Sequence, residues 1–331
     1  MSVAGAILMA MEARSSSLPI RLDGFATYAD LLASGLSRGR IRTMVQRGEL
    51  ISLTRGIYIS ADLVHRMRIL PEADTATRAM AALARLGPGT VVSHTTAAQL
   101  HGLDQLTIGR RLTLSRQPGA GSRSARQPGL LVHNTGLPPG DVGWRLGVPV
   151  TTVPRTVIDL ARTLEFRSGL VVADSALHQR LTSKQELRDV LAACRRWPGA
   201  SKAAEVVEFA DGRAESVLES IARVVFRDLG LPAPELQVEI RDADGNFIGR
   251  VDFLWRRFRT IAEVDGALKY DDRGRARAQL RRDKLLRAED YEVEHFTWRD
   301  VVHEHDQVGR SLRTAFRLGG QRAASGSGSA A

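Results

Sequence analysis

Apolar positions recur at helical spacing near the start of the chain and change to alternation a few residues later. The stretch ATYADLLASGLSRGRIRTMVQRGEL, residues 26–50, predicts two short helices. Gly35 interrupts the pattern where a tight turn is needed, and Ser37 stands where a capping residue would begin the second helix. The following LISLTRGIYIS alternates around Arg55 and Gly56 and predicts a β-hairpin. A helix-turn-helix followed by a hairpin predicts a winged helix.

Basic side chains occupy the two parts of a winged helix that meet nucleic acid. They are Arg38, Arg40, Arg42 and Arg47 on the second helix and Arg55 at the tip of the hairpin. These positions contact the groove and the phosphates in winged helices that bind DNA, so we expect them to do so here. Many winged helices bind proteins instead, and the sequence leaves that alternative open.

A mixed pattern of helices and strands continues to a boundary that we place near Gly212. Strand-like runs such as RRLTLSR and LLVHN stand between amphipathic runs such as TATRAMAALARL and SKQELRDVLAAC. Ser183 and Glu186 form a capping-box pattern at the start of the last of these. His94 and His101 lie seven residues apart without an evident third ligand, so we expect them to pack rather than to bind metal.

Three carboxylates stand in two strand-like segments of the C-terminal region. The run AESVLESIARVVFRDLGL predicts a helix, and Asp244-Gly245 predicts a hairpin turn before the strand that contains Asp252. Alternation places Asp252 opposite an apolar face, and in TIAEVDG it puts Glu263 and Asp265 on one face. If the two strands are antiparallel neighbours, the three carboxylates come together.

Like charges at close range repel one another unless a cation lies between them. Mg²⁺ suits such a site because it is a hard ion that binds carboxylates and substrate phosphate. Lys269 follows closely in a chain that mostly uses arginine, and its amine can orient water or contact a phosphate. The alternative is that arginines such as Arg250 and Arg256 neutralise the acids as ordinary ion pairs. The residues alone leave both interpretations open.

A strongly basic helix is predicted after these strands, in DRGRARAQLRRDK. Arg273, Arg277 and Arg281 lie one turn apart, and Arg282 and Lys284 lie beside them. Like charges at this spacing cost stability, so we expect a phosphate backbone as the partner of this face. A solvated face or an acidic partner also fits the pattern.

Composition strengthens the case for a nucleic-acid partner and indicates an intracellular setting. The chain has 331 residues, which predicts about two domains, and a formal net charge of +10. An arginine-rich composition without functional meaning would give the same charge. Hydrophobic residues make up 43 %, which permits a sizeable core. Cys194 is the one cysteine and VAGAILMAM lacks a signal-peptide pattern, so we expect a cytoplasmic, nucleoid-associated protein.

The order of the C-terminal features, from the helix glutamate through EVDG to RRDKLLRAEDYEVEHFTWRDV, resembles the Vsr-like (very-short-patch-repair-like) branch of the PD-(D/E)XK nuclease superfamily. The resemblance implies that Glu219 is the helix acid, Asp252 the central metal-binding acid and Glu263 the second strand acid. Asp265 stands where the superfamily often has lysine, and in the Vsr-like branch a histidine or another base follows near the position of Lys269. The identity of any general base is therefore open.

The N-terminal half resembles AbiEi-type antitoxin winged-helix proteins through GFATYADLLASGLSRGRIRTMVQRGELISLTRGIYI, VVSHTTAAQLHGL and VPVTTVPRTVIDLA. The two resemblances imply a multidomain α/β (α+β) protein with an N-terminal winged helix-turn-helix, a mixed α/β middle region and a C-terminal restriction-endonuclease-like mixed sheet flanked by helices. The boundaries that we expect are a flexible N-terminus over 1–18, a winged helix over 19–70, an AbiEi-like middle domain and connector over 71–212, a nuclease-like domain over 213–316 and a disordered tail over 317–331.

The leading hypothesis is a protein that binds double-stranded DNA and carries a metal-dependent DNA endonuclease domain, in phage defence or DNA repair. The resemblance implies that Asp252, Glu263 and Asp265 hold Mg²⁺ (or Mn²⁺), and that Glu219 and Lys269 complete the catalytic set. The alternative is a transcriptional repressor or antitoxin of a type IV toxin–antitoxin system, with an inactive nuclease-like domain and a cognate toxin or defence-system protein as partner. A third hypothesis, an RNA-acting protein, is weaker because only 5 % of the residues are aromatic.

Overall fold

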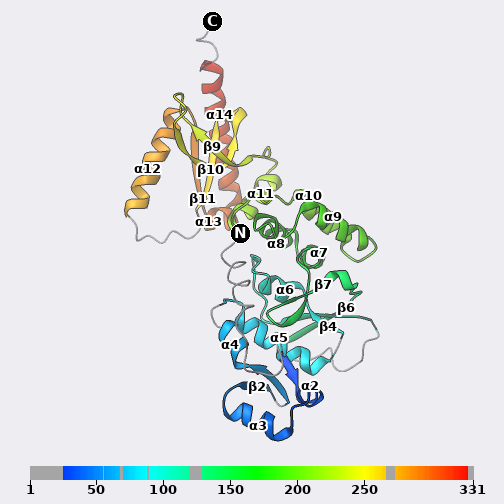
Figure 1. Cartoon of the computed structure of the whole chain (residues 1–331). Helices are drawn as coiled ribbons and strands as arrows, with labels where there is room; N and C mark the ends of the chain where they lie inside the picture. The colour runs from blue at the N-terminus through cyan, green and yellow to red at the C-terminus, as the bar shows by residue number, and fades with distance from the viewer. Residues whose placement is uncertain are drawn as a thin grey trace. The chain divides into compact units, whose positions relative to one another are not determined.

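The computed structural model of the chain describes residues 25–54, 56–67, 70–87, 89–118, 129–265 and 273–326 (Figure 1). It divides into two compact units, one of Met1–Gly102 with Gly109–Thr152 and one of Leu103–Ile108 with Val153–Ala331. The first unit contains a three-stranded and a five-stranded sheet, the second unit contains a four-stranded sheet, and each unit has its own apolar core. No helix of the described residues is long and apolar enough to cross a membrane.

The described part of the first unit begins with the predicted winged helix. Thr27 and Ser37 cap its two helices with their side-chain oxygens, and Gly35 makes the turn between them at a φ of 95°. The three strands pair antiparallel in the order β1-β3-β2. The small core consists of Ala26, Leu31, Ile41, Met44 and Leu50. The elements are β1 (Phe25–Thr27), α2 (Tyr28–Ala33), α3 (Arg38–Gln46), β2 (Leu50–Thr54), β3 (Ile57–Ser60) and α4 (Ala61–Met67).

A five-stranded sheet forms the rest of the first unit, in the order β6-β5-β4-β8-β7. Helices α5 and α6 pack against it through buried residues such as Met80, Leu83, Ala97 and Leu100. The sheet is mixed because β4 pairs parallel with β8 and antiparallel with β5. The elements are α5 (Ala73–Leu86), β4 (Thr90–Val92), α6 (His94–Leu100), β5 (Leu112–Arg116), β6 (Leu130–Asn134), η1 (Pro139–Asp141), β7 (Val142–Arg145) and β8 (Val148–Thr151).

Two histidines of this unit pack within it, as the sequence predicts. His94 stacks on His133 with ring centroids 3.8 Å apart, and its φ of 49° is unusual for a residue other than glycine. Nε2 of His101 lies 2.8 Å from the carbonyl oxygen of Thr151, and burial lowers the pKa of His101. Both rings therefore contribute to packing within the unit.

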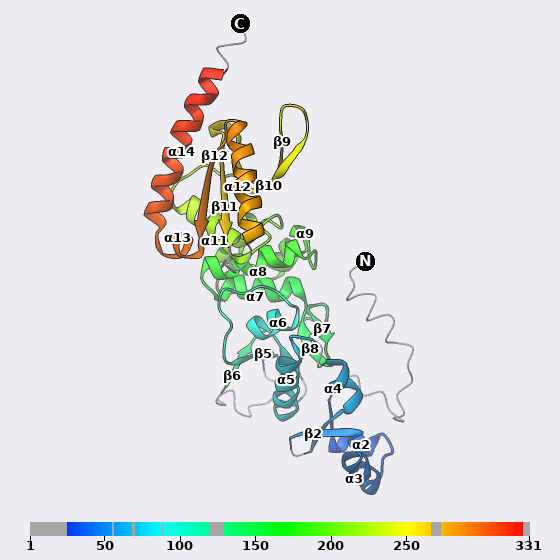
Figure 2. The same cartoon turned by 90° about the vertical axis from the view of Figure 1, so that its left-hand side faces the viewer.

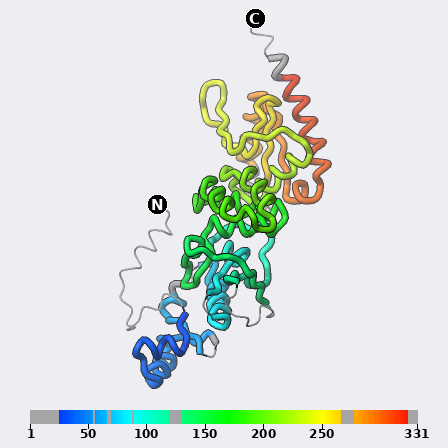
Figure 3. The backbone as a smooth tube through the Cα atoms, turned by 90° about the vertical axis from the view of Figure 1, so that its right-hand side faces the viewer, coloured from blue at the N-terminus to red at the C-terminus, as the bar shows by residue number. Residues whose placement is uncertain are grey.

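Helices α7–α10 open the second unit and pack on one another, as the green tube in Figure 3 shows. Ser183 and Glu186 form the predicted capping box at the start of α9. Cys194 follows that helix and is buried. The elements are α7 (Val153–Thr163), α8 (Phe166–His178), α9 (Lys184–Ala193) and α10 (Ala200–Phe209).

A four-stranded sheet with helices on both faces completes the second unit. The strand order is β12-β11-β10-β9, and only the β11–β12 pair is parallel. Helices α11, α13 and α14 cover one face and α12 covers the other, as Figures 1 and 2 show. The elements are α11 (Val217–Asp228), β9 (Glu235–Arg241), β10 (Phe247–Trp255), η2 (Arg256–Phe258), β11 (Thr260–Asp265), α12 (Arg273–Ala288), β12 (Glu292–Thr297), α13 (Trp298–His303) and α14 (His305–Gly326).

A buried ion pair fixes α11 against α8. Nη1 of Arg223 donates to Oδ2 of Asp174 at 2.7 Å, and the two side chains are 9 % and 1 % exposed. Oδ1 of Asp174 also accepts a hydrogen bond from the Asp211 N–H, and the guanidinium lies over the ring of Phe209. Burial raises the pKa of Asp174 to about 6, so the carboxylate is ionised at neutral pH. Because Glu219 lies one turn before Arg223, the pair also sets the direction in which Glu219 points.

The C-terminal helix differs from the sequence prediction. The Gly/Ala/Ser-rich composition predicted a disordered tail over 317–331, but α14 continues to Gly326, and residues 327–331 lie outside the described part. The helix is held by its apolar face, since Phe316 stacks on Phe258 at 4.5 Å and Leu312 belongs to the main core. Gly319 lies directly against the carbonyl oxygen of Phe258. Burial of this face therefore outweighs the flexible composition.

The fold class predicted from the sequence, a multidomain α/β protein, is confirmed. The division into compact units falls at Val153, so α7–α10 lie in the same unit as the C-terminal sheet. The finer boundaries predicted at residues 70 and 212 stay predictions. The helix expected from Ala214 begins at Val217, because Ser216 accepts the Glu219 N–H and caps it there.

Replacement of Gly319 by alanine is expected to destabilise the protein. A Cβ at this position would lie 2.1 Å from the Phe258 carbonyl oxygen, so α14 would have to shift, at a cost of about 1–3 kcal/mol. A Cβ at Gly320 would meet nothing within 4 Å, so Gly320→Ala is the matched control and should gain up to about 1 kcal/mol. Urea unfolding of both variants measures the difference, and equal stabilities would contradict the packing of α14 on η2.

Candidate functional site

A row of polar side chains crosses one face of the four-stranded sheet. Glu263 is the parallel partner of His295, and Phe253 lies opposite Ala262, which puts Asp252 opposite Glu263. The predicted meeting of Asp252 and Glu263 is therefore confirmed as a placement, and a histidine joins them. The row consists of Gln237 on β9, Asp252 on β10, Glu263 on β11 and His295 on β12.

This face of the sheet is not the polar face that strand alternation predicts. The next row carries Leu254, Ile261 and Val293, and α12 covers them with Leu286. The opposite face carries the main core of the unit. The sheet is thus apolar on both faces, and the carboxylates lie inside it because α12 lies over them.

Glu219 reaches the row from α11 and is held by three hydrogen bonds. Its oxygens accept from the Glu215 N–H at 3.0 Å, from Oγ of Ser216 at 2.8 Å and from Nε2 of Gln237 at 2.9 Å. Gln237 donates to Oδ1 of Asp252 as well, at 3.2 Å, and so bridges two carboxylates. Its backbone has a φ of 53°, a conformation that costs a residue other than glycine energy and that is common at functional sites.

The carboxylates of the cluster resist ionisation. Burial raises the pKa of Glu219, and the negative charge of Asp252 raises it further. Burial also raises the pKa of Asp252, with Asp265 adding to the effect, and it raises the pKa of Glu263. Raised carboxyl pKa values in one cluster are typical of functional sites, although structural ion-pair networks produce them too.

Glu263 is paired with an arginine and has one oxygen to spare. Nη2 of Arg282 contacts Oε2 of Glu263, and the side chain of Glu263 is 8 % exposed. Oε1 of Glu263 is buried and has no hydrogen-bond partner among the described residues. The Arg282 stem packs on Gly249, where a Cβ would lie 2.8 Å from Cδ of Arg282. The sequence placed Arg282 on an exposed DNA-binding face, whereas it points inward to the acids.

A histidine and a second aspartate extend the cluster beyond the predicted residues. Nε2 of His295 lies 2.8 Å from Oδ2 of Asp283, and Nδ1 lies 3.5 Å from Oδ2 of Asp265. Gln279 contacts the same ring at 3.2 Å. The available signal was the polar stripe Gln279, Asp283 on the inner face of α12, which the surrounding arginines conceal. Asp265 therefore lies at the edge of the cluster and faces a histidine.

Some predicted residues cannot be placed. Lys269 and Arg55 lie outside the described residues, and so does the side chain of Arg273. Of the other basic residues predicted on α12, Arg277, Arg281 and Lys284 are exposed. Leu280 and Leu285 lie on the same outer surface and are 69 % and 45 % exposed.

The predicted DNA-binding arginines of α3 are all exposed. Ile41 and Met44 bury the inner face of the helix, which leaves the arginines on the outside. Within the described part of the chain, none of the four arginines forms an ion pair with a carboxylate. The four are Arg38, Arg40, Arg42 and Arg47.

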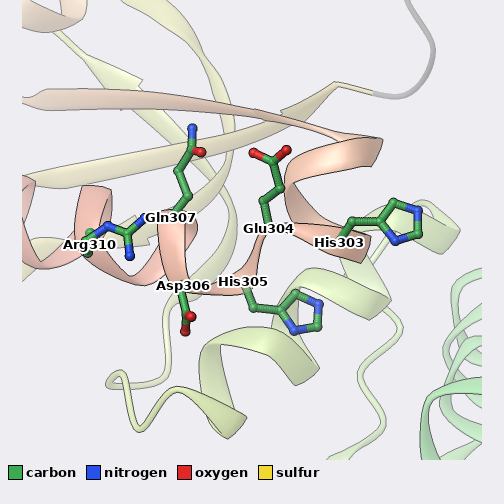
Figure 4. A pocket seen from close by; sticks show the side chains of 6 residues that line it. All are labelled: His303, Glu304, His305, Asp306, Gln307 and Arg310. Carbon is green, nitrogen blue, oxygen red and sulfur yellow. The ribbon is translucent and has the colours of Figure 1, made fainter.

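A shallow hollow of about 390 Å³ lies at the turn between α13 and α14, and His303, Glu304 and His305 are among the residues that line it. Figure 4 shows that its side chains point in different directions, with Glu304 and Gln307 on one side and His305 and Asp306 on the other. Glu304 pairs with Arg299 at 2.8 Å. The side chains do not converge on a common ligand, so this hollow is not a candidate site.

Two regions of the chain match known antitoxin families. Residues 20–61 match the family described as "Transcriptional regulator, AbiEi antitoxin", which covers the winged helix. Residues 90–209 match the "AbiEi antitoxin C-terminal domain", which covers the five-stranded sheet and α7–α10. The AbiEi part of the predicted resemblance is thus confirmed. Both regions end before α11 and do not include the carboxylate cluster.

Two relatives from Mycobacterium tuberculosis are similar over most of the chain. They are "Uncharacterized protein MT2308" of strain CDC 1551 / Oshkosh and "Uncharacterized protein Rv2248" of strain ATCC 25618 / H37Rv. Each is 33 % identical over 235 residues, which are 70 % of this chain and 79 % of the relative. The chain belongs to the family of these two proteins, and its N-terminal regions are of the AbiEi antitoxin type.

One solved structure is similar to part of the chain. The crystal structure of the RV2827C protein from Mycobacterium tuberculosis matches 56 % of this chain and 71 % of its own, with 15 % sequence identity. The TM-score is 0.33, which is too low to carry an argument about function.

Substitution of Glu219 by glutamine is expected to stabilise the protein at neutral pH. The pKa of Glu219 is raised in the folded protein relative to the unfolded chain. The protonated side chain therefore stabilises the fold fully at pH values below its unfolded pKa of about 4.3, and this stabilisation is lost as the pH rises through the folded pKa. Glutamine stays neutral, its carbonyl oxygen can accept from the Glu215 N–H and from Gln237, and its amide can donate to Oγ of Ser216. Its gain, up to about 1 kcal/mol, should appear at pH 7–8 and vanish near pH 4.

The matched variant Glu219→Ala loses the same charge and all three hydrogen bonds, and it should lose about 1–3 kcal/mol at every pH. Unfolding curves of both variants across this pH range are the measurement. A glutamine variant less stable than wild type at pH 8 would contradict the raised pKa.

Proposed function

We propose that this protein is a DNA-binding transcriptional regulator of the AbiEi antitoxin type. The observation that carries the proposal is the set of four exposed arginines on α3, the second helix of the winged helix, and at its C-cap; three lie within the helix and Arg47 follows it. The match of residues 20–61 to a family of transcriptional regulators supports it.

The surroundings of these arginines favour a polyanionic partner. Arginines elsewhere in the chain have carboxylates beside them, such as Arg188 with Glu208 and Arg256 with Glu235. The arginines of α3 form no ion pair with a carboxylate among the described residues, and their like charges repel one another. A phosphate backbone removes this repulsion and releases counterions, which makes binding favourable and dependent on salt.

The match of residues 90–209 to an antitoxin domain supports a second partner for the same protein. We infer that this region binds a cognate toxin, as in a type IV toxin–antitoxin system with a role in phage defence. The winged helix would then repress transcription of the operon while the middle region neutralises the toxin. This is the alternative that the sequence leaves open beside the nuclease hypothesis.

Replacement of Arg40 and Arg47 by alanine is expected to weaken binding to duplex DNA of any sequence by about 10-fold or more at low salt. The slope of log K against log salt should fall by about 1 for each arginine removed. Fluorescence anisotropy with the duplex upstream of the gene measures both quantities. Arg188→Ala is the control, since it removes an exposed arginine already paired with Glu208. Unchanged binding in the double variant would sink the proposal.

A second candidate function, a metal-dependent phosphodiesterase, is favoured by the spare oxygen of Glu263. Its Oε1 is buried without a partner among the described residues, as is Oδ1 of Asp283, and hard oxygens of this kind suit Mg²⁺ or Mn²⁺. Within the described ranges no group of three or more His, Cys, Asp or Glu side chains is already arranged to hold a metal. The donor chemistry fits the ion, while Arg282 competes with it for Glu263.

Asp252 and Glu263 would hold the ion, with Asp265 beside them. A bound Mg²⁺ would polarise a phosphodiester and lower the pKa of a bound water. Glu219 and Gln237 orient Asp252 through hydrogen bonds. Lys269 stays the proposed contact to water or to the phosphate, and the general base stays open.

The variant Asp252→Ala is expected to lose Mn²⁺ binding and any Mg²⁺-dependent cleavage, while duplex binding through α3 survives. Calorimetric titration with Mn²⁺ gives a readout that does not depend on activity, and supercoiled DNA with Mg²⁺ or EDTA reports cleavage. The control is Glu239→Ala, which removes an exposed carboxylate from the same sheet. Equal Mn²⁺ binding by wild type and Asp252→Ala would refute the metal site and leave the regulator proposal intact.

A further inference from the structure

A glycine lies on the exposed face of α3 without a reason in the fold. Gly39 is the second residue of the helix, and it does not have the positive φ that would require glycine. A Cβ built on Gly39 would meet nothing within 4 Å. Glycine is the least favourable helical residue apart from proline, so alanine would make a more stable helix here. A surface that comes close to the backbone of Gly39 from outside explains why a side chain is absent.

The position of Gly39 on the helix identifies that surface. At about 100° per residue, Ile41, Met44 and Val45 form the inner face, and Gly39 lies almost opposite them. Arg42 and Gln46 share its outward side and are exposed. The outward face is therefore a small depression beside two long polar side chains.

The remaining arginines lie on the two flanks of the same helix. Arg38 is on one flank, and Arg40 and Arg47 are on the other, each about a quarter turn from the outward direction. Thr43 also faces outward, but its Oγ1 donates to the carbonyl oxygen of Gly39 at 3.1 Å. A helix with a cation on each flank matches a groove with a phosphate strand on each side.

We propose that α3 enters the major groove of duplex DNA with Gly39 against the base edges, and that Arg42 and Gln46 read the sequence there. This assignment rests on the proposed DNA-binding function and adds which residues determine specificity. An arginine donates two hydrogen bonds to O6 and N7 of guanine, and a glutamine pairs in the same way with N6 and N7 of adenine. The preferred site therefore contains a guanine and an adenine within the few base pairs that one helix spans, while the flanking arginines hold phosphates.

The test begins with selection of binding sequences from a random duplex library by the full-length protein and by variants. Wild type should select a guanine and an adenine, Arg42→Ala should lose the guanine preference by about 10- to 100-fold, and Gln46→Ala should lose the adenine preference. Replacement of the selected guanine by 7-deazaguanine should weaken binding of the duplex by wild type and leave binding by Arg42→Ala unchanged. Arg40→Ala should weaken binding to all sequences alike.

The glycine itself gives a readout that a merely structural role would not produce. Gly39→Ala should raise the melting temperature by about 1–3 °C and still weaken binding to the selected duplex by about 10-fold. Gly320→Ala is the matched control, because it adds the same methyl group to an open helical position and should leave DNA binding unchanged.

Three results would overturn the inference. If Gly39→Ala bound the selected duplex with wild-type affinity, the proposed close approach of the bases to Gly39 would be refuted. If Arg42→Ala selected the same consensus sequence as wild type, the proposed reading of guanine by Arg42 would be refuted. Neither result would contradict the proposed DNA-binding function. Absence of duplex binding by wild type at low salt would overturn both the proposed base recognition by Arg42 and Gln46 and the proposed regulator function. The exposed face of α3 would then be a protein-binding surface.

Discussion

The buried ion pair between Arg223 and Asp174 is the constraint on which the arrangement of the second unit depends. Both charges are almost fully withdrawn from water, so loss of either partner would leave the other uncompensated, at a cost of about 3–5 kcal/mol. The pair fixes the rotation of α11 about its axis, and two different properties follow from that rotation. Leu218 and Val225 are turned to the main core, and Glu219 is turned to the polar row of the sheet. A contact outside the carboxylate cluster thus contributes both to the stability of the unit and to the placement of the helix that carries one of its acids.

The carboxylate cluster reduces the stability of the sheet that carries it. Apolar residues occupy both faces, yet one row of the second face consists of acids, an amide and a histidine. Burial raises the pKa of Glu219, Asp252 and Glu263, because a buried carboxylate loses the hydration that stabilises its charge. Gln237 and Arg282 relieve part of the repulsion by bridging and pairing the acids. An apolar row at this place would make a more stable sheet.

The periodicity of apolar and polar residues in the sequence predicts some features of this structure and not others. Alternation within a strand depends on the backbone alone, so it was sufficient to bring Asp252 beside Glu263, and the S-x-x-E pattern at Ser183 was sufficient to predict the start of α9. Neither pattern carries information about which helix packs over the strands. The packing of α12 on this face and the inward direction of the Arg282 side chain were therefore not predicted. His295 and Asp283 are distant in the chain and meet only through the parallel pairing of β11 with β12. Gln237 was missed because its left-handed backbone has no mark in the residue type. Composition predicted disorder for residues after 316, where burial of Phe316 and the close approach of Gly319 prevail.

The packing of α14 has a consequence for the order in which the chain acquires its structure during synthesis. Val308, Leu312 and Ala315 complete the face of the sheet that α11 and α13 cover only in part, and they follow every strand in the sequence. While the ribosome is still making residues before 308, the apolar surface formed by Phe253, Trp255 and Val264 lacks this cover. The winged helix and the five-stranded sheet lie upstream and need no residue from α14. Domains fold in the order in which they emerge, so the region that carries the α3 arginines can be in place while the carboxylate-bearing sheet still lacks its C-terminal helix.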